Sequence, residues 1–150
     1  MNTKLVSSIA AVAGSRLVTI SVDGLLLDAA RLLSDTQVSL IVVCNADGTM
    51  AGVITKTKIV RQIGHCHGSA CTTAVADIMT ADVAFCRQTD PLSDVLSMMQ
   101  ERGHVHVPVV DATSRPSGVV NARDALRELM AEGEYETSLL RDYVMGTGYH

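Results

Sequence analysis

The chain has 150 residues, of which 47% are hydrophobic and 19% charged, and its net charge at pH 7 is −4. A chain of this length can bury a core as one domain or as two small halves. The negative charge argues against a nucleic-acid partner, and one Phe, three Tyr and no Trp provide few rings for stacking on bases. No apolar run reaches the roughly 18 residues that span a bilayer, so we expect no membrane contact and a cytoplasmic protein.

The N-terminal segment allows one alternative to that location. A lysine precedes the apolar run at residues 5–13, whose small-residue end resembles the cleavage site of a secretory signal. Ser7 and Ser8 interrupt this run, however, and residues 8–13 align with residues 75–80 further along the chain. We therefore interpret the segment as part of an internal repeat.

In chain order, the predicted elements occur twice. A short strand at 18–22, a helix with an apolar stripe from Leu25 to Leu33 and a buried strand at 38–44 come first. The same order returns as a strand at 85–89, a helix with a stripe from Val95 to Met99 and a buried strand at 105–110. Each half then continues through a turn and a short strand into a closing helix. The pattern of each half is therefore β-α-β-β-α.

Two glycine-initiated motifs define this repeat most clearly. Residues 52–58 read Gly-Val-Ile-Thr-Lys-Thr-Lys, and residues 118–124 read Gly-Val-Val-Asn-Ala-Arg-Asp. The interval between the two glycines equals the interval between Lys58 and Asp124, at 66 residues (118 − 52 and 124 − 58). In the second motif we predict a helix that begins after Asn121, its N-cap, with Asp124 in the first turn, where the helix dipole favours a carboxylate.

In combination, these features closely resemble those of a tandem CBS-domain protein of the small stand-alone type. The resemblance is carried by Asp77-Ile78-Met79-Thr80, by Val107-Pro108-Val109-Val110-Asp111 and by the two matched motifs. It implies an α/β fold in which two pseudo-twofold-related repeats pack sheet to sheet. It divides the chain into a first repeat at 5–63, an inter-repeat loop at 64–76, a second repeat at 77–130 and a C-terminal helical tail at 131–150.

The resemblance also implies a function, namely a non-catalytic regulatory module that binds an adenosine-containing nucleotide in a cleft between the repeats. AMP or ATP is the foremost ligand, with ADP, NAD and S-adenosylmethionine as further options. In the family motif the final acidic residue accepts hydrogen bonds from the ribose hydroxyls, as an acceptor-only carboxylate can. By this analogy the main cleft contains Asp124, Asn121, Arg123, Ser15, Val18, Val38 and Ser39.

The second cleft departs from the family pattern, because Lys58 stands where the acidic residue is expected. A lysine has donors only and cannot accept hydrogen bonds from two ribose hydroxyls. This cleft is therefore either vacant or a site for phosphate or another anion. Its residues are Thr55, Thr57, Lys58, Thr80, His104 and Val105.

A cluster of four possible soft ligands leaves a different function open. His65, Cys66, His67 and Cys71 could hold zinc, although their spacing matches no standard finger. Alternatively, Cys66 and Cys71 could form a disulfide or redox pair, or remain reduced thiols. The competing hypotheses are thus a metal- or redox-responsive protein and a dimerisation scaffold, whereas the nucleotide hypothesis requires no metal.

The partners are also inferred from the resemblance. Modules of this family pair through their helices, so we expect a homodimer, with the stripes 25–33 and 95–99 as a candidate surface. A regulated protein is expected too, and the sequence does not identify it. We expect no catalysis, because neither motif combines a nucleophile with a base.

Overall fold

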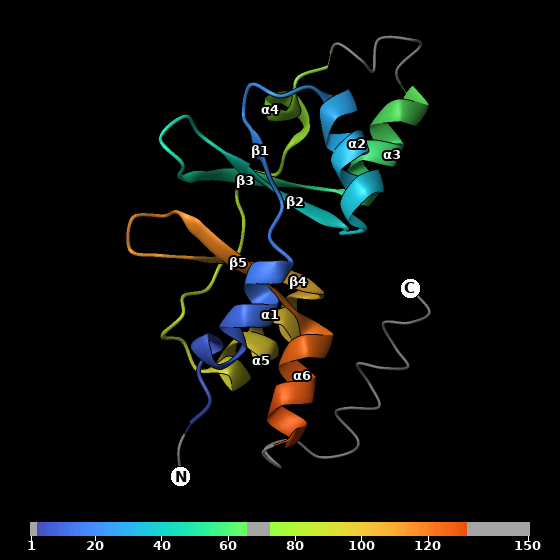
Figure 1. Cartoon of the computed structure of the whole chain (residues 1–150). Coiled ribbons are helices and arrows are strands. Elements are labelled where there is room, and N and C mark those ends of the chain that lie inside the picture. The colour runs from blue at the N-terminus through green and yellow to red at the C-terminus, as the bar shows by residue number, and fades with distance from the viewer. Residues whose placement is uncertain (1–2, 66–72, 132–150) are drawn as a thin grey trace. The chain divides into compact units, whose positions relative to one another are not determined.

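The computed structural model describes residues 3–65 and 73–131 (Figure 1). Within them the chain forms two compact units. Unit 1 comprises residues 3–16, 85–111 and 117–131, and unit 2 comprises residues 17–65, 73–84 and 112–116. The N-terminal segment therefore belongs to the unit built mainly from the second repeat. The predicted α/β class is confirmed.

Unit 2 contains a three-stranded sheet in the order β1 (Thr19–Ser21), β2 (Leu40–Cys44) and β3 (Met50–Thr55). Strand β1 is parallel to β2, and β2 is antiparallel to β3, with Ile41 opposite Ile54. Helices α2 (Leu26–Thr36) and α3 (Lys56–His65) lie side by side, and the short α4 (Val75–Ile78) completes the unit (Figure 1). Its core joins α2, α3, α4 and the sheet through Leu26, Ala29, Leu33, Ile41, Val43, Ile54, Ile59, Val75 and Ile78.

Unit 1 contains a two-stranded sheet of β4 (His106–Val110) and β5 (Pro116–Asn121). Helices α5 (Leu92–Arg102) and α6 (Ala122–Ala131) pack together, and the N-terminal segment adds a 3-10 helix, η1 (Val6–Ile9), and α1 (Ala10–Ser15). The core includes Val6, Ile9, Leu92, Val95, Leu96, Met99, Leu126 and Leu129. Four elements of the first repeat recur in the second repeat 66 residues later, which is the interval between the two motifs. The corresponding pairs are α2 and α5, β2 and β4, β3 and β5, and α3 and α6.

The prediction of a strand at 85–89 is wrong, because this segment forms only an isolated parallel bridge between Cys86 and Val109. Its counterpart β1 pairs with β2, and the N–H of Val42 donates to the carbonyl of Val18 at 2.9 Å. Pro108 occupies the position equivalent to Val42 and has no N–H to donate. The remaining bonds run from the Cys86 N–H to the Pro108 carbonyl and from the Val110 N–H to the Cys86 carbonyl.

The two apolar stripes are used inside the units. In α2 the side chains of Leu26, Ala29 and Leu33 are buried in the core of unit 2, at helical spacing. In α5 the side chains of Val95 and Met99 are buried in the core of unit 1. Leu25 is still 39% exposed, and Ala30, Leu32 and Met98 are only partly buried, so a dimer surface on these helices remains a prediction.

Two further expectations concern membrane-spanning helices and the C-terminal tail. Of the helices in residues 3–65 and 73–131, none combines the length and apolarity that a membrane crossing requires. Residues 132–150 of the predicted helical tail lie outside the described residues.

Candidate functional site

The second motif forms the turn from β5 into α6, as predicted. Strand β5 ends at Asn121, and the Asn121 Oδ1 atom accepts a hydrogen bond of 2.8 Å from the backbone N–H of Arg123. Asn121 thus caps the helix by satisfying one of its unpaired N–H groups. The predicted cap is confirmed, and it places Asp124 in the first turn of α6.

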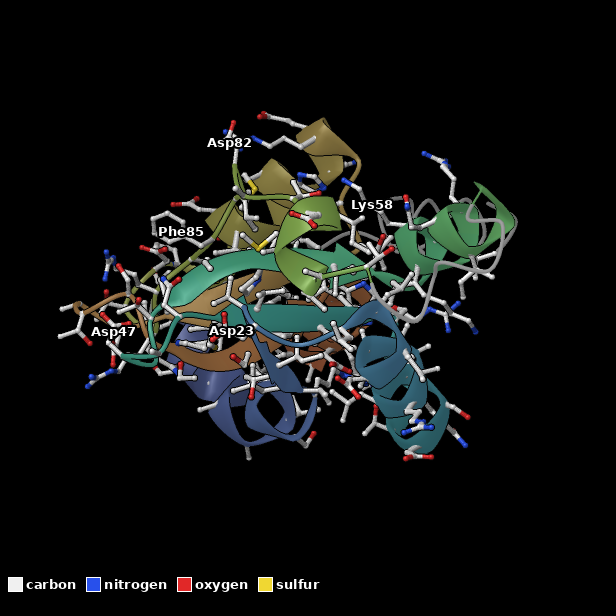
Figure 2. The ribbon with its side chains drawn as sticks, turned by 90° about the horizontal axis from the view of Figure 1, so that it is seen from above. Asp23, Asp47, Lys58, Asp82 and Phe85 are labelled. Carbon is white, nitrogen blue, oxygen red and sulfur yellow. The ribbon has the colours of Figure 1, made fainter. Side chains whose placement is uncertain are left out.

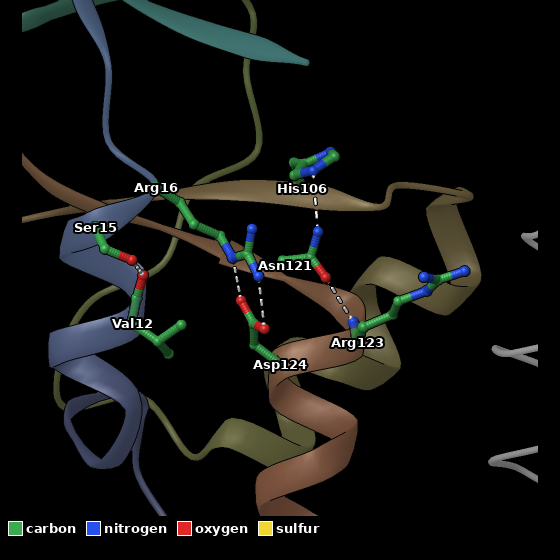
Figure 3. A network of polar contacts seen from close by, with 7 residues as sticks. All are labelled: Val12, Ser15, Arg16, His106, Asn121, Arg123 and Asp124. Atoms are coloured by element: carbon green, nitrogen blue, oxygen red, sulfur yellow. Dashed lines mark hydrogen bonds and ion pairs between the residues drawn. The ribbon is translucent and has the colours of Figure 1, made fainter. Parts of the chain in front are cut away.

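The cap also fixes the orientation of the Asn121 amide. Because Oδ1 faces the backbone of Arg123, the Nδ2 group is the part that meets His106 Nε2, at 3.1 Å (Figure 3). Nδ2 carries only protons to donate, so Nε2 must accept. Half-buried His106 is therefore held as the neutral tautomer with its proton on Nδ1. Burial, and then the nearby charge of Arg16, lower the pKa of His106, whereas Asp124 opposes this shift.

Asp124 is paired with Arg16, which lies directly after α1. The Arg16 Nε–H donates to Asp124 Oδ2, and Nη2–H donates to Oδ1 at 2.9 Å (Figure 3). Of the residues that the structure describes, Asp124 is the one polar or charged residue in the buried class. Its side chain is 4% exposed, whereas the Arg16 side chain is 41% exposed. The hydrogen bond with Asp124 raises the pKa of Arg16, so the guanidinium keeps its charge.

Gly118 explains why α1 ends beside this motif. A Cβ atom on Gly118 would lie 2.9 Å from the backbone carbon and 3.0 Å from the carbonyl oxygen of Ala13. The close approach of α1 to the start of the motif thus requires a glycine, and it brings the residue after α1 to Asp124. Sequence reasoning missed Arg16. The available signal was a lone cation next to Ser15, between two apolar segments.

The other residues predicted for the main cleft are divided between the units. Ser15 ends α1 in unit 1, where its hydroxyl donates to the Val12 carbonyl at 2.6 Å. Arg123 is exposed on the first turn of α6. Val18, Val38 and Ser39 belong to unit 2, where both valines pack against its core and the Ser39 carbonyl accepts from the Lys56 N–H.

The first motif repeats this turn with other side chains. Thr55 is the counterpart of Asn121, and its Oγ1 atom accepts a hydrogen bond of 3.2 Å from the Lys58 N–H. Lys58 projects from the first turn of α3 and is exposed (Figure 2). Its Nζ atom lies 3.5 Å from Thr80 Oγ1. Thr57 is exposed as well. The structure thus brings Thr55, Lys58 and Thr80 together in unit 2.

The remaining residues predicted for the second cleft, His104 and Val105, belong to unit 1. Both are exposed in the turn between α5 and β4, and the Val105 carbonyl accepts from the Ala122 N–H at 2.9 Å. The soft-ligand cluster is not described: Cys66, His67 and Cys71 lie outside the described residues, as does the side chain of His65.

The residues present in unit 1 fit one part of an adenosine ligand. Asp124 offers a carboxylate at a helix start, and such a group can accept hydrogen bonds from both vicinal hydroxyls of a ribose. Both of its oxygens already accept from Arg16. A ribose that reaches Asp124 must therefore replace the guanidinium or share the carboxylate with it.

Comparison with known proteins gives a family match across both repeats. The family model described as "CBS domain" matches residues 6–65 and again residues 75–131. A curated relative, the "Uncharacterized 17.7 kDa protein in bps2 3'region" of Acidianus ambivalens, is 25% identical over 121 residues, which are 81% of this chain and 72% of the relative.

Solved structures with the same fold include CBS-domain pairs. The CBS-pair protein CBSX2 from Arabidopsis thaliana is 19% identical with a TM-score of 0.74, covering 90% of this chain and 100% of its own; a second CBSX2 structure is a complex with AMP. The CBS domain pair of MJ0100, in complex with 5'-methylthioadenosine and S-adenosyl-L-methionine, is 22% identical with a TM-score of 0.73, covering 87% of this chain and 99% of its own. At these identities the likeness establishes the fold.

Proposed function

This chain belongs to the CBS-domain family, and we propose on that premise that it is a regulatory module that binds an adenosine-containing ligand at Asp124. The ligands named for CBSX2 and MJ0100 support the proposal, because AMP, 5'-methylthioadenosine and S-adenosylmethionine share one chemical unit. Each carries an adenosine whose ribose keeps both vicinal hydroxyls. A site for this unit needs a group that can accept two hydrogen bonds.

The buried carboxylate of Asp124 at the start of α6 is the observation that carries this proposal. A buried charge persists where it is paired, and Arg16 supplies that pairing in the ligand-free chain. The positive end of the α6 dipole and the exposed side chain of Arg123 add positive potential beside it. This setting favours an anionic group attached to the ribose.

One adenosine site per chain follows from the difference between the two motifs. Lys58 occupies the position equivalent to Asp124 and offers only N–H donors to a ligand. The first motif therefore lacks the acceptor on which the proposed ribose contact depends. Signalling without catalysis completes the proposal, with the bound ligand altering how the chain engages a regulated protein.

Ligand titration of the unfolding midpoint tests this function. A ligand at 100 times its Kd stabilises the folded chain by about 2.7 kcal/mol, or about 5–10 °C for a protein of this size. We expect such a shift with AMP or ATP, its loss in Asp124→Asn, and its retention in Lys58→Gln, the matched change in the other motif. Midpoints that move by less than about one degree with millimolar AMP, ATP, 5'-methylthioadenosine and S-adenosylmethionine would overturn the proposal.

Native mass spectrometry of freshly purified protein adds a second, independent test. It reports retained nucleotide, oligomeric state and bound metal in one measurement. A retained nucleotide in a dimer would agree with the proposed function and with the homodimer expected for the family. Bound zinc without nucleotide would instead favour the metal-responsive alternative through His65, Cys66, His67 and Cys71.

A further inference from the structure

The acceptor on which the proposed ribose contact depends is occupied by the chain itself. Arg16 donates to both oxygens of Asp124 in the fork arrangement that a guanidinium makes with a carboxylate. A ribose diol presents the same pair of donors in a similar spacing. Arg16 and the diol therefore compete for one carboxylate. The free energy of ligand binding then depends on which group pairs with the displaced guanidinium.

Displaced Arg16 keeps its charge but loses its partner. A guanidinium cannot give up its proton near neutral pH, so the charge must be met by water or by another anion. The Arg16 side chain is 41% exposed while that of Asp124 is 4% exposed, so the arginine already reaches solvent, from which a dissolved anion can approach it. An anionic group on the ligand would restore the ion pair, whereas a neutral ligand would leave it broken.

The polar cluster drawn around Arg16 holds no second carboxylate among its labelled residues. Figure 3 shows the polar groups of this cluster, and among the residues that it labels Asp124 is the one carboxylate, beside the cations Arg16 and Arg123. His106 is engaged with the Asn121 amide as a neutral acceptor. Within this cluster, an anion that meets released Arg16 must therefore arrive with the ligand.

We propose that Arg16 is a specificity-determining residue that exchanges Asp124 for an anionic group of the bound ligand. It thereby favours a nucleoside 5'-phosphate over the neutral nucleoside. This inference rests on the proposed function and extends it from adenosine ligands in general to those that carry a phosphate. A role for Arg16 as a mere tie between α1 and α6 predicts no such preference.

Calorimetric Kd values for AMP and for adenosine distinguish the two roles. We would compare the natural chain with Arg16→Met, which keeps much of the side-chain volume without the charge, and with Arg16→Lys, which keeps the charge without the fork. Arg127→Met is the matched control, since Arg127 is exposed on α6, the helix that carries Asp124, and its loss changes the net charge equally. The ratio of adenosine Kd to AMP Kd measures the phosphate preference.

In Arg16→Met we expect this ratio to fall by about tenfold, the scale of one charge-assisted pair at a half-exposed site. Adenosine should bind more tightly than to the natural chain, because no ion pair has to be broken. Arg16→Lys should retain a preference for AMP, and Arg127→Met should leave the ratio unchanged. Agreement on all three variants would support the exchange.

Two outcomes would overturn it, and they are distinguishable from each other. If AMP and adenosine bind the natural chain and Arg16→Met with the same Kd ratio, Arg16 has no part in specificity while the proposed function stands. If neither ligand binds the natural chain or any Arg16 variant, the adenosine site itself is wrong and the inference falls with it. Unfolding curves recorded for each variant establish that the chain titrated is folded.

Discussion

Removing either partner of the Arg16–Asp124 pair should destabilise the ligand-free protein, but by unequal amounts. Arg16→Met leaves a carboxylate that is 4% exposed without its two charge-assisted hydrogen bonds. Such an uncompensated buried charge costs about 2–3 kcal/mol at a site that water can still partly reach. Asp124→Asn instead leaves a guanidinium that is 41% exposed and easily hydrated. We expect a loss of about 1 kcal/mol there, including the weakened interaction with the α6 dipole.

Thermal unfolding of the ligand-free variants at neutral pH measures this asymmetry. One kcal/mol corresponds to about 2–4 °C in the midpoint for a chain of this size, so Arg16→Met should lose about 4–12 °C and Asp124→Asn about 2–4 °C. Arg16→Lys should fall between them, because it retains the charge but cannot form the bidentate contact. Equal losses in Arg16→Met and Asp124→Asn would refute the argument, since the difference in burial would then have no energetic consequence.

Three further predictions test other parts of unit 1 and the tight contacts of the chain. Burial and the Arg16 charge lower the pKa of His106, so the unfolded chain binds a proton at a higher pH than the folded chain. Stability should therefore be lost as the pH falls below about 6.5, and His106→Gln should flatten that slope in unfolding midpoints measured from pH 8 to pH 5; an identical slope in the variant would contradict this. Gly118→Ala should cost about 1–3 kcal/mol in urea unfolding because its Cβ meets the Ala13 backbone, whereas Gly64→Ala, with nothing within 4 Å, should gain up to about 0.5–1 kcal/mol. Similar effects at the two glycines would argue against the close approach. Burial raises the pKa of Cys86 to about 12 and also raises the pKa of half-buried Cys44, so at mildly alkaline pH Cys86 should resist iodoacetamide and the more accessible Cys44 should react faster. Peptide mapping by mass spectrometry would show equal labelling if Cys86 were accessible.

The sequence was sufficient for the features that depend on local pattern. The cap at Asn121 and the helix start that places Asp124 in a first turn were both predictable, because capping involves residues two or three positions apart. The repeat was equally accessible, since four pairs of elements keep the interval of the two motifs. Capping acts over a few residues and a repeat is visible by comparing the chain with itself, so neither requires knowledge of tertiary contacts.

The misses concern contacts between distant parts of the chain. Arg16 and Asp124 are 108 positions apart, and no periodicity connects them. The strand expected at 85–89 has a suitable composition, but its pairing depends on an N–H that Pro108 lacks in the neighbouring strand. The apolar stripes were recognised as stripes, and the sequence could not decide whether a second chain or their own unit covers them.

The two motifs share one backbone arrangement, but their last residues make different contacts. This difference supports the hypothesis of a single adenosine site. In each unit the last motif residue contacts the segment that directly follows a short helix. Asp124 contacts Arg16, which follows α1, and Lys58 contacts Thr80, which follows α4. Asp124 is buried by this contact, and its charge is balanced. Lys58 remains exposed, and a neutral hydroxyl at 3.5 Å is its contact. Under the proposed exchange, a ligand at Asp124 breaks an ion pair and forms two new contacts, one to the carboxylate and one to the released guanidinium. A ligand at Lys58 would displace little and gain one exposed, screened contact. The proposed function therefore assigns selectivity to the site at Asp124, because there a ligand that lacks either the diol or the anionic group would break the ion pair without replacing both of its contacts.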